Sequence, residues 1–435
     1  MNKKAFEMKM LEFSGKLARN IYLQSIKYAF TALTPLIIVG AFSVLFKSVL
    51  CDETTGLAAR EGFEFLAQYK SIFSSIQYGS YNILSLLIVF LISMELAKNK
   101  GYEKLGYIPA IFSLSAYITI VPKFINFTDA NSEATFLVEN VIAKQYTDTS
   151  SLFLAMLTAI LATSLFCWLS SLEKLKIKMP DSVPSNVSVA FSALFPIAIG
   201  LIIFSVGEFI FEMIFNISTY QAIFTMVQVP LGKIVQGLPG VLFLMFISQT
   251  FWMFGIHGNQ MIKPVREPLL LDAINQNMDA FSAGKEIPNI VTMPFWDIYG
   301  TVGGSGVTLG LIIAIIIFSK RKDHREVTKL SSVPGIFNIN ETMIFGVPIV
   351  LNPIMAVPFI LTPLVTLSIG YLMTIIGFAG RTVVMIPWTT PPIISAYIAT
   401  AGSIGAVITQ IICIIASVLI YAPFIRMLNK ERLDS

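Results

Sequence analysis

Residues 150–172 read SSLFLAMLTAILATSLFCWLSSL, a run of 23 residues without a charged side chain. A helix that crosses the hydrocarbon core of a bilayer needs about 20 mostly apolar residues, so this run predicts a transmembrane helix. Further runs meet that criterion or come close to it: 29–50, 78–97, 187–207, 303–319 and 402–425. The sequence therefore predicts an all-α integral membrane protein, a bundle of about eight to ten helices.

The composition of the whole chain supports this class. Of 435 residues, 55% are hydrophobic and 13% are charged, and the mean hydropathy is +0.75. A soluble domain carries about 25% charged residues, which excludes an ordinary soluble protein. The net charge of +4 is modest. We therefore expect the lipid bilayer as the main surrounding and no nucleic-acid partner.

The first 28 residues are charged and interrupted rather than continuously apolar. They show no short apolar core followed by a small-residue cleavage site, so we expect no removable signal peptide. Their apolar residues fall at helical spacing and predict an amphipathic helix on the membrane surface, the alternative being an ordinary solvated helix. These apolar residues are Phe6, Met10, Phe13, Leu17, Ile21 and Ile26.

The three cysteines, Cys51, Cys167 and Cys413, are far apart in the sequence. Their spacing matches neither a disulfide framework nor a metal site. We interpret them as buried small hydrophobic residues, and we expect no metal and no cofactor.

Basic residues mark the cytoplasmic connections of a membrane protein. Five of the ten residues from Lys320 to Lys329 are Lys or Arg, and His324 within this loop is expected at the surface. The connections 51–77 and 123–149 are mixed or slightly acidic. This alternation predicts that both termini are cytoplasmic. The basic connections are the N-terminus, Lys98–Lys104, Lys174–Lys178, Lys320–Lys329 and the C-terminal tail.

The second half of the chain lacks clean apolar runs where the topology needs spans. Charged residues are scattered through 255–302, prolines and glycines interrupt 333–353, and 385–392 reads Met-Ile-Pro-Trp-Thr-Thr-Pro-Pro. These segments predict broken helices or re-entrant hairpins, the kind of element in which transporters build substrate sites. We therefore expect residues 1–235 to form a scaffold and residues 236–435 to handle substrate.

Glu341 and His257 are the most informative polar residues of the second half. A carboxylate within the bilayer is costly and indicates a partner or a task, and Asn338 and Asn340 lie beside Glu341. The alternative is a polar hairpin tip at the membrane surface. His257 stands between glycines and can both donate and accept hydrogen bonds, although a lone histidine is more often structural.

Further candidate ligands surround these two residues in the sequence. Indole rings stack on the apolar faces of sugar rings, while amide and carboxylate groups bond the hydroxyls. For the tryptophans, the alternative is the aromatic belt at the membrane surface. The candidate substrate-binding residues are Gln249, Trp252, Asn259, Asp297, Asn338, Asn340 and Trp388.

Four motifs occur in a fixed order: Gly-Ile-His-Gly at 255–258, Gly-Gly-Ser-Gly at 303–306, Gly-Ile-Phe-Asn-Ile-Asn-Glu at 335–341 and Pro-Trp-Thr-Thr-Pro-Pro at 387–392. Together they resemble the enzyme IIC permease of sugar phosphotransferase systems, in the lactose/cellobiose class. The resemblance covers nearly the whole chain. The stretch 399–406 departs from the pattern, which leaves the sugar open among cellobiose, diacetylchitobiose, lactose and related β-disaccharides.

This resemblance implies a homodimer in the bacterial cytoplasmic membrane, with ten spans and two re-entrant hairpins in each subunit. It implies a disaccharide substrate whose 6-hydroxyl is phosphorylated by a separate phosphorylated IIB protein, itself served by a IIA protein. By the same resemblance Glu341 and His257 lie near that hydroxyl in catalytic roles. The positive charge of residues 320–329 suits docking of an acidic partner in the cytoplasm, the alternative being that it only orients the protein in the membrane.

Three other functions use similar residues. An ion-coupled secondary transporter would have the same broken helices and a midplane carboxylate, but it would release its sugar unmodified. An intramembrane enzyme would use Glu341 and His257 as an acid–base pair. A channel fits least, because the sequence shows no repeated filter or ring-forming charge pattern.

Overall fold

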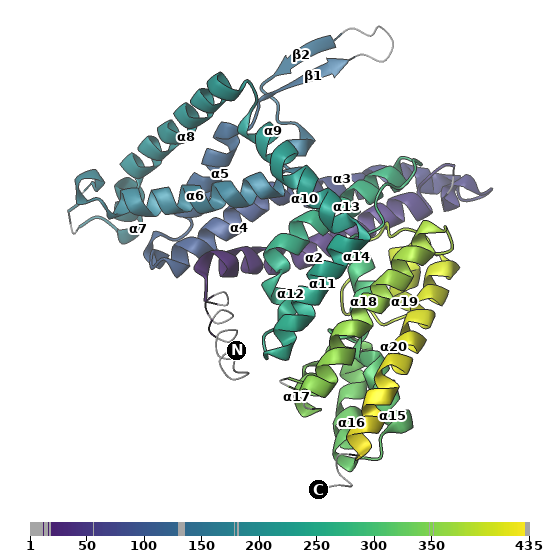
Figure 1. Cartoon of the computed structure of the whole chain (residues 1–435). Helices are drawn as coiled ribbons and strands as arrows, with labels where there is room; N and C mark the ends of the chain where they lie inside the picture. Colours follow the sequence, from purple (N-terminus) through teal and green to yellow (C-terminus); the bar gives the residue numbers. More distant parts are fainter. Residues whose placement is uncertain are drawn as a thin grey trace. The chain divides into compact units, whose positions relative to one another are not determined.

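The computed structural model describes Glu12, Lys16 and residues 19–54, 56–128, 135–177, 179–180, 182–347, 349–350 and 352–430. These residues form a mostly helical protein with one two-stranded antiparallel sheet, which confirms the predicted fold class (Figure 1). Most of the predicted amphipathic segment, with Phe6, Met10, Phe13 and Leu17, lies outside the described residues. Ile21 and Ile26 belong instead to a 30-residue helix, α2.

The chain forms two compact units. One contains Arg19–Ile37 and Gln77–Leu231, and the other contains Ile38–Ile76 and the chain from Gly232 onward. The predicted division by function, with a scaffold to residue 235 and substrate handling after it, stays a prediction.

The first unit is built around α4, α5, α6 and α8, which pack against one another. Its interior uses small side chains to bring helices close, as is typical of membrane bundles. Gly200 of α8 faces the Phe112 ring so closely that an added Cβ would lie 2.5 Å from Cζ. The elements are α4 (Leu84–Asn99), α5 (Ile108–Ile120), α6 (Leu152–Ser171), α7 (Ser185–Ser192), α8 (Leu194–Phe215), α9 (Thr219–Ile223) and η8 (Phe224–Gln228), with short turns η3 (Tyr81–Ile83), η4 (Glu103–Leu105), η5 (Lys144–Tyr146), η6 (Thr149–Ser151) and η7 (Glu173–Leu175).

A β-hairpin stands in the connection between α5 and α6, where the sequence predicted only a mixed loop. Strand β1 (Phe124–Thr128) pairs antiparallel with β2 (Thr135–Glu139), and Phe124 lies opposite Glu139. Aromatic and β-branched residues in both strands favour this extended pairing.

The second unit holds the four motifs. Within it α18 packs against α20 and α11, and α15 packs against α20 and α16. Its elements are η1 (Leu57–Ala59), η2 (Glu64–Tyr69), α11 (Leu238–Met253), α12 (Gly258–Met261), α13 (Lys263–Ser282), α14 (Met293–Phe295), the π-helical turn η9 (Trp296–Gly300), α15 (Thr308–Phe318), α16 (Lys322–Ile336), α17 (Glu341–Gly346), α18 (Pro353–Ile375), α19 (Ile394–Ala399) and α20 (Ile404–Lys430). Three helices cross the boundaries between the units in sequence: α2 (Ile21–Leu50), α3 (Lys70–Ser80) and α10 (Val229–Gln236).

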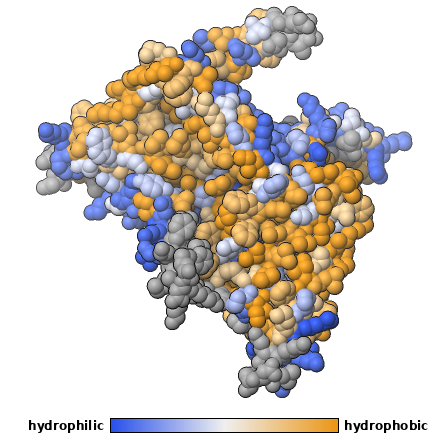
Figure 2. Space-filling model, in the orientation of Figure 1, coloured by the Kyte–Doolittle hydropathy of each residue, from blue (hydrophilic) through white to orange (hydrophobic). Residues whose placement is uncertain are grey.

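Among the described residues, six helices are long and apolar enough to cross a membrane. A further pair, Thr219–Gln236 and Leu238–Met253, would make a seventh span with an 86° bend. Hydrophobic residues cover most of the surface over α18 and α20, as expected for helices that face lipid (Figure 2). The count of ten spans stays a prediction. The six helices are Ile21–Leu50, Glu64–Asn99, Thr149–Ser171, Val187–Phe215, Pro353–Ile375 and Ile404–Asn429.

Two expectations about the basic loop are wrong. Residues from Lys322 are not a loop but the first turns of α16, which Asp323 favours because an acidic side chain in the first turn suits the helix dipole. His324 is 2% exposed and therefore buried rather than at the surface. Burial of the three free cysteines, in contrast, is confirmed.

Candidate functional site

His257 lies where the chain leaves α11 and turns back toward it. Gly255 adopts φ +76°, a conformation that favours glycine, and the chain then begins α12 at Gly258. A Cβ at Gly258 would lie 1.7 Å from the Ser248 carbonyl oxygen, so only glycine allows this approach of backbone to backbone. The two glycines therefore fix His257 beside α11, as the non-helical backbone predicted there requires.

The Gly-Gly-Ser-Gly motif is a tight turn that precedes α15. Gly303, Gly304 and Gly306 all have positive φ, and Tyr421 of α20 donates a hydrogen bond to the Gly306 carbonyl at 2.7 Å. A Cβ at Gly304 would lie 2.4 Å from Cγ of Asn340. The turn therefore serves close packing against the Asn-Glu motif.

Asn338 joins three of the motifs. Its Oδ1 accepts a hydrogen bond from the Gly303 amide at 2.7 Å, and its Nδ2 donates to the Trp388 carbonyl at 2.5 Å and to the Thr390 carbonyl at 3.3 Å. Asn338 itself has φ +62°, which asparagine tolerates better than most residues. Its amide group is therefore occupied by the protein and holds the motifs together.

Asn340 makes a second link to the glycine turn. Its buried Nδ2 donates to the Ser305 carbonyl at 2.7 Å and to Thr308 Oγ1 at 2.9 Å. The next residue, Glu341, begins α17. The turn thus sets the position from which the Glu341 side chain extends.

Glu341 and His257 face each other across the motifs. His257 Nε2 lies 3.9 Å from Glu341 Oε1, and the side chains are 41% and 51% exposed. The His257 ring lies against Trp252, with ring centroids 4.5 Å apart. Trp252 is 2% exposed, so it forms the back of the pair rather than an open surface. The acid and the imidazole therefore meet at an accessible place with a rigid apolar wall behind them.

Two buried polar atoms on α11 find no hydrogen-bond partner among the described residues. They are Oε1 of Gln249, whose Nε2 contacts Met245 Sδ at 3.0 Å, and Nε1 of Trp252. A buried polar atom without a partner costs about 1–3 kcal/mol. Atoms of this kind also occur elsewhere among the described residues, for example Tyr81 Oη and Ser93 Oγ, so these two do not by themselves mark a ligand site.

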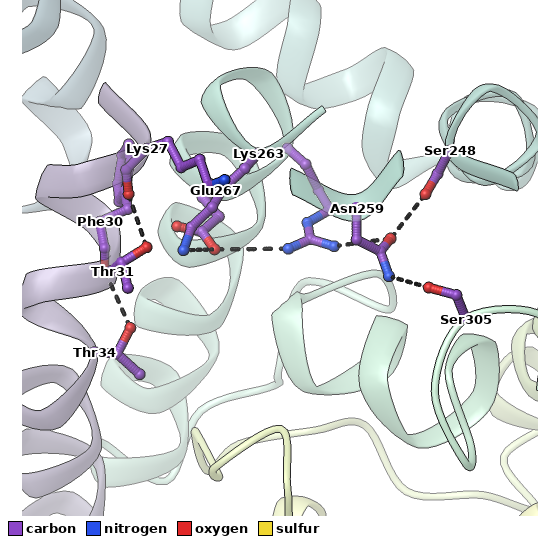
Figure 3. Close-up of polar contacts among 10 residues, drawn as sticks. Lys27, Phe30, Thr31, Thr34, Ser248, Asn259, Lys263, Glu267 and Ser305 are labelled. Carbon is purple, nitrogen blue, oxygen red and sulfur yellow. Dashed lines mark hydrogen bonds and ion pairs between the residues drawn. The ribbon is translucent and has the colours of Figure 1, made fainter. Parts of the chain in front are cut away.

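Asn259 and Trp388 differ in what they offer a ligand. Asn259 accepts a hydrogen bond from Ser248 Oγ at 2.9 Å and donates one to Ser305 Oγ at 3.1 Å, so its amide links α11 to the glycine turn (Figure 3). Trp388 is 51% exposed, so part of its side chain is accessible from outside the chain.

Charged residues on α13 were missing from the sequence-based candidates. Lys263, Arg266 and Glu267 are each 7% exposed, and Asp297 interacts electrostatically with Arg266 and Glu267. The structure thus places the candidate Asp297 beside this buried charge cluster. The signal in the sequence was the presence of charges in a segment that the topology puts within the membrane. Among the described residues, no group of three or more His, Cys, Asp or Glu side chains could hold a metal ion.

Comparisons with known proteins agree with the geometry. A family model described as "Phosphotransferase system, EIIC" matches residues 27–363. The chain is 31% identical to the lichenan permease IIC component of Bacillus subtilis (strain 168), covering 100% of this chain and 95% of the relative. It is 32% identical to the oligo-beta-mannoside-specific EIIC component of the same organism, over 98% of this chain and 93% of the relative.

Among solved structures, the chain is similar to the transporter ChbC, the IIC component of the N,N'-diacetylchitobiose-specific phosphotransferase system. The TM-score is 0.88 at 29% sequence identity, and the match covers 97% of this chain and 96% of that one.

Proposed function

The chain belongs to the EIIC family of the phosphotransferase system, and from this premise we propose that it binds a β-linked disaccharide outside the cell and presents its 6-hydroxyl to a IIB protein. As a multi-pass permease of this family, the chain works within a phosphotransferase system. Similar proteins are named for lichenan, oligo-beta-mannosides, cellobiose and diacetylchitobiose. These names share β-linked glucose- or mannose-type units, which supports a β-disaccharide.

The site suits such a ligand. The exposed Trp388 provides an indole for one sugar ring, and the half-exposed Glu341 and His257 provide a carboxyl group and an imidazole for a hydroxyl. Gln249 Oε1 and Trp252 Nε1 can accept and donate a hydrogen bond, respectively. In this proposal Asn259, Asn338 and Asn340 shape the site, and Asp297 supports it from the charge cluster.

The transfer step balances with these groups. The bond between phosphorus and a side chain of IIB breaks, and a bond between phosphorus and O6 of the sugar forms. The O6 proton passes to Glu341 or to His257, which lie close enough to share one hydroxyl. A positioned base of this kind contributes about 10²–10⁴-fold in rate.

The partners and the orientation follow from the same proposal. We place both termini in the cytoplasm of a bacterium, and on the same side the segment 320–329, which leads into α16 and has five Lys or Arg residues. This basic segment would attract an acidic IIB surface and speed its encounter. A homodimer, and a IIA protein that phosphorylates IIB, complete the assembly.

The observation that carries the proposal is the contact of His257 with Glu341 where the four family motifs meet. We would measure binding of cellobiose, diacetylchitobiose, lactose and mannobiose to purified wild type and to Glu341→Gln. The wild type is expected to bind one or two of these sugars. The variant should bind them about 10-fold or more weakly, because a hydrogen bond to a charged group contributes about 1.5–3 kcal/mol. Unchanged affinity in Glu341→Gln would remove Glu341 from the site.

A further inference from the structure

A buried cluster of charges lies at the start of α13. Glu267 Oε1 is 3.4 Å from Lys263 Nζ and 3.6 Å from Arg266 Nη2. The Arg266 guanidinium also lies over the Trp296 ring, 5.0 Å from its centroid. The ammonium group of Lys263 and the guanidinium of Arg266 are therefore held beside the Glu267 carboxylate, largely away from solvent. Electrostatic interactions are stronger there than in water.

Arg266 extends this cluster toward the site. Its Nη1 lies 3.5 Å from Oδ1 of Asn259, the oxygen that also accepts a hydrogen bond from Ser248 Oγ. A guanidinium only donates hydrogen bonds, so the amide oxygen of Asn259 must face it. The Asn259 Nδ2 then points the other way and donates to Ser305 Oγ.

Ser305 passes this constraint to the acid. Its carbonyl accepts the hydrogen bond from Asn340 Nδ2 at 2.7 Å, and Asn340 directly precedes Glu341. The contacts therefore form an unbroken path from Glu267 through Arg266, Asn259 and Ser305 to the backbone that carries Glu341. All four contacts lie within one compact unit.

We propose that Arg266 is a positioning residue: it fixes the amide of Asn259, which holds the glycine turn 303–306 against Asn340 and so keeps Glu341 opposite His257. The sugar-related consequences of this role rest on the proposed function. The effect of Arg266 on the backbone does not rest on it. That effect concerns how rigidly the turn 303–306 and the segment after Asn340 are held.

The test compares Arg266→Gln with Lys263→Gln. Both variants remove one buried cation from the same carboxylate, at nearly equal distances and equal burial. A purely structural charge pair would respond alike to both changes. Asn259→Ala, which changes no charge, tests the same path if Arg266→Gln does not fold.

The first readout needs no sugar. Amide hydrogen exchange should rise about 10-fold in 301–308 and 338–344 in Arg266→Gln and in Asn259→Ala, and the double variant should be no worse than the more affected single one. Lys263→Gln should leave both segments within about twofold of wild type. Equal exchange in Arg266→Gln and Lys263→Gln, or additive effects in the double variant, would overturn the proposal.

The second readout is sugar affinity per folded molecule, which should fall about 10-fold in Arg266→Gln and in Asn259→Ala, since a site displaced by about 1 Å loses much of its function. If wild type binds no β-disaccharide, the proposed function fails while the exchange result still decides the role of Arg266. If wild type binds sugar and Arg266→Gln binds it equally well with unchanged exchange, the role of Arg266 is refuted and the proposed function stands.

Discussion

Gly258→Ala tests how strictly the backbone next to His257 controls the site. The added Cβ would lie 1.7 Å from the Ser248 carbonyl oxygen, whereas real contacts of this kind stay beyond 3.0 Å. The backbone at 258 must therefore move by about 1.3 Å, the difference between these distances, and His257 moves with it. A displacement of about 1 Å at a reacting group costs about 10²-fold in rate. We expect phosphorylation of bound sugar to fall by about that factor.

The assay is phosphorylation of a radiolabelled disaccharide by purified permease in proteoliposomes with phosphorylated IIB, normalised to folded protein by size-exclusion chromatography. Gly207→Ala is the matched control. Gly207 lies within α8, and a Cβ there meets nothing within 4 Å. This control should keep full activity and gain a little stability, about 0.5–1 kcal/mol, because glycine is a weak helix former. Full activity per folded molecule in Gly258→Ala would refute the close approach and the positional argument built on it.

Two further predictions concern neighbouring motifs. Trp388→Ala should weaken sugar binding by about 2- to 12-fold, the equivalent of about 0.5–1.5 kcal/mol of ring stacking, while Trp388→Phe stays within about threefold of wild type. Equal affinities for all three proteins in a calorimetric titration would remove Trp388 from the site. Asn338→Ala should lower thermal stability in detergent more than Asn338→Gly. Both variants lose the hydrogen bonds to Gly303 and Trp388, but only alanine is strained at φ +62°, by about 1–2 kcal/mol. A reversed order of melting temperatures would contradict this.

The fold class could be predicted because long apolar runs indicate that the chain lies in lipid. Few backbone structures other than α-helices can cross a bilayer. The detail of single helices could not be predicted. Helix α18 is absent from the predicted runs because Pro358 and Pro363 lie inside it. In the structure α18 nevertheless runs from Pro353 to Ile375 and packs against α11 and α20, and such packing tolerates proline within a transmembrane helix.

The apolar run at 303–319 was also misleading at its start. Its first residues form the glycine turn with positive φ, so α15 begins only at Thr308. Hydropathy cannot distinguish a turn of small residues from a helix, because both are apolar on average. The φ angles require tertiary partners such as Asn340, which is far away in the sequence.

The sequence motifs contain the residues of the candidate site, but they do not show which side chains are exposed and which are buried or bonded within the protein. Sequence cannot show that Trp252 is buried behind His257 while Trp388 is exposed, since both are tryptophans beside proline- or glycine-rich turns. It also cannot show that the amide of Asn338 is already bonded within the protein. The proposed role of Arg266 depends on the contact of its guanidinium with Oδ1 of Asn259, which only a structure can show.

The measurement that tests the central claim most directly is disaccharide uptake into membrane vesicles that contain this chain. Uptake is measured with phosphoenolpyruvate and the soluble phosphotransferase proteins, and again without them, with proton and sodium gradients collapsed in both cases. The account predicts that labelled sugar accumulates as a sugar phosphate only in the first case. Accumulation of unmodified sugar that depends on an ion gradient and not on phosphoenolpyruvate would contradict it.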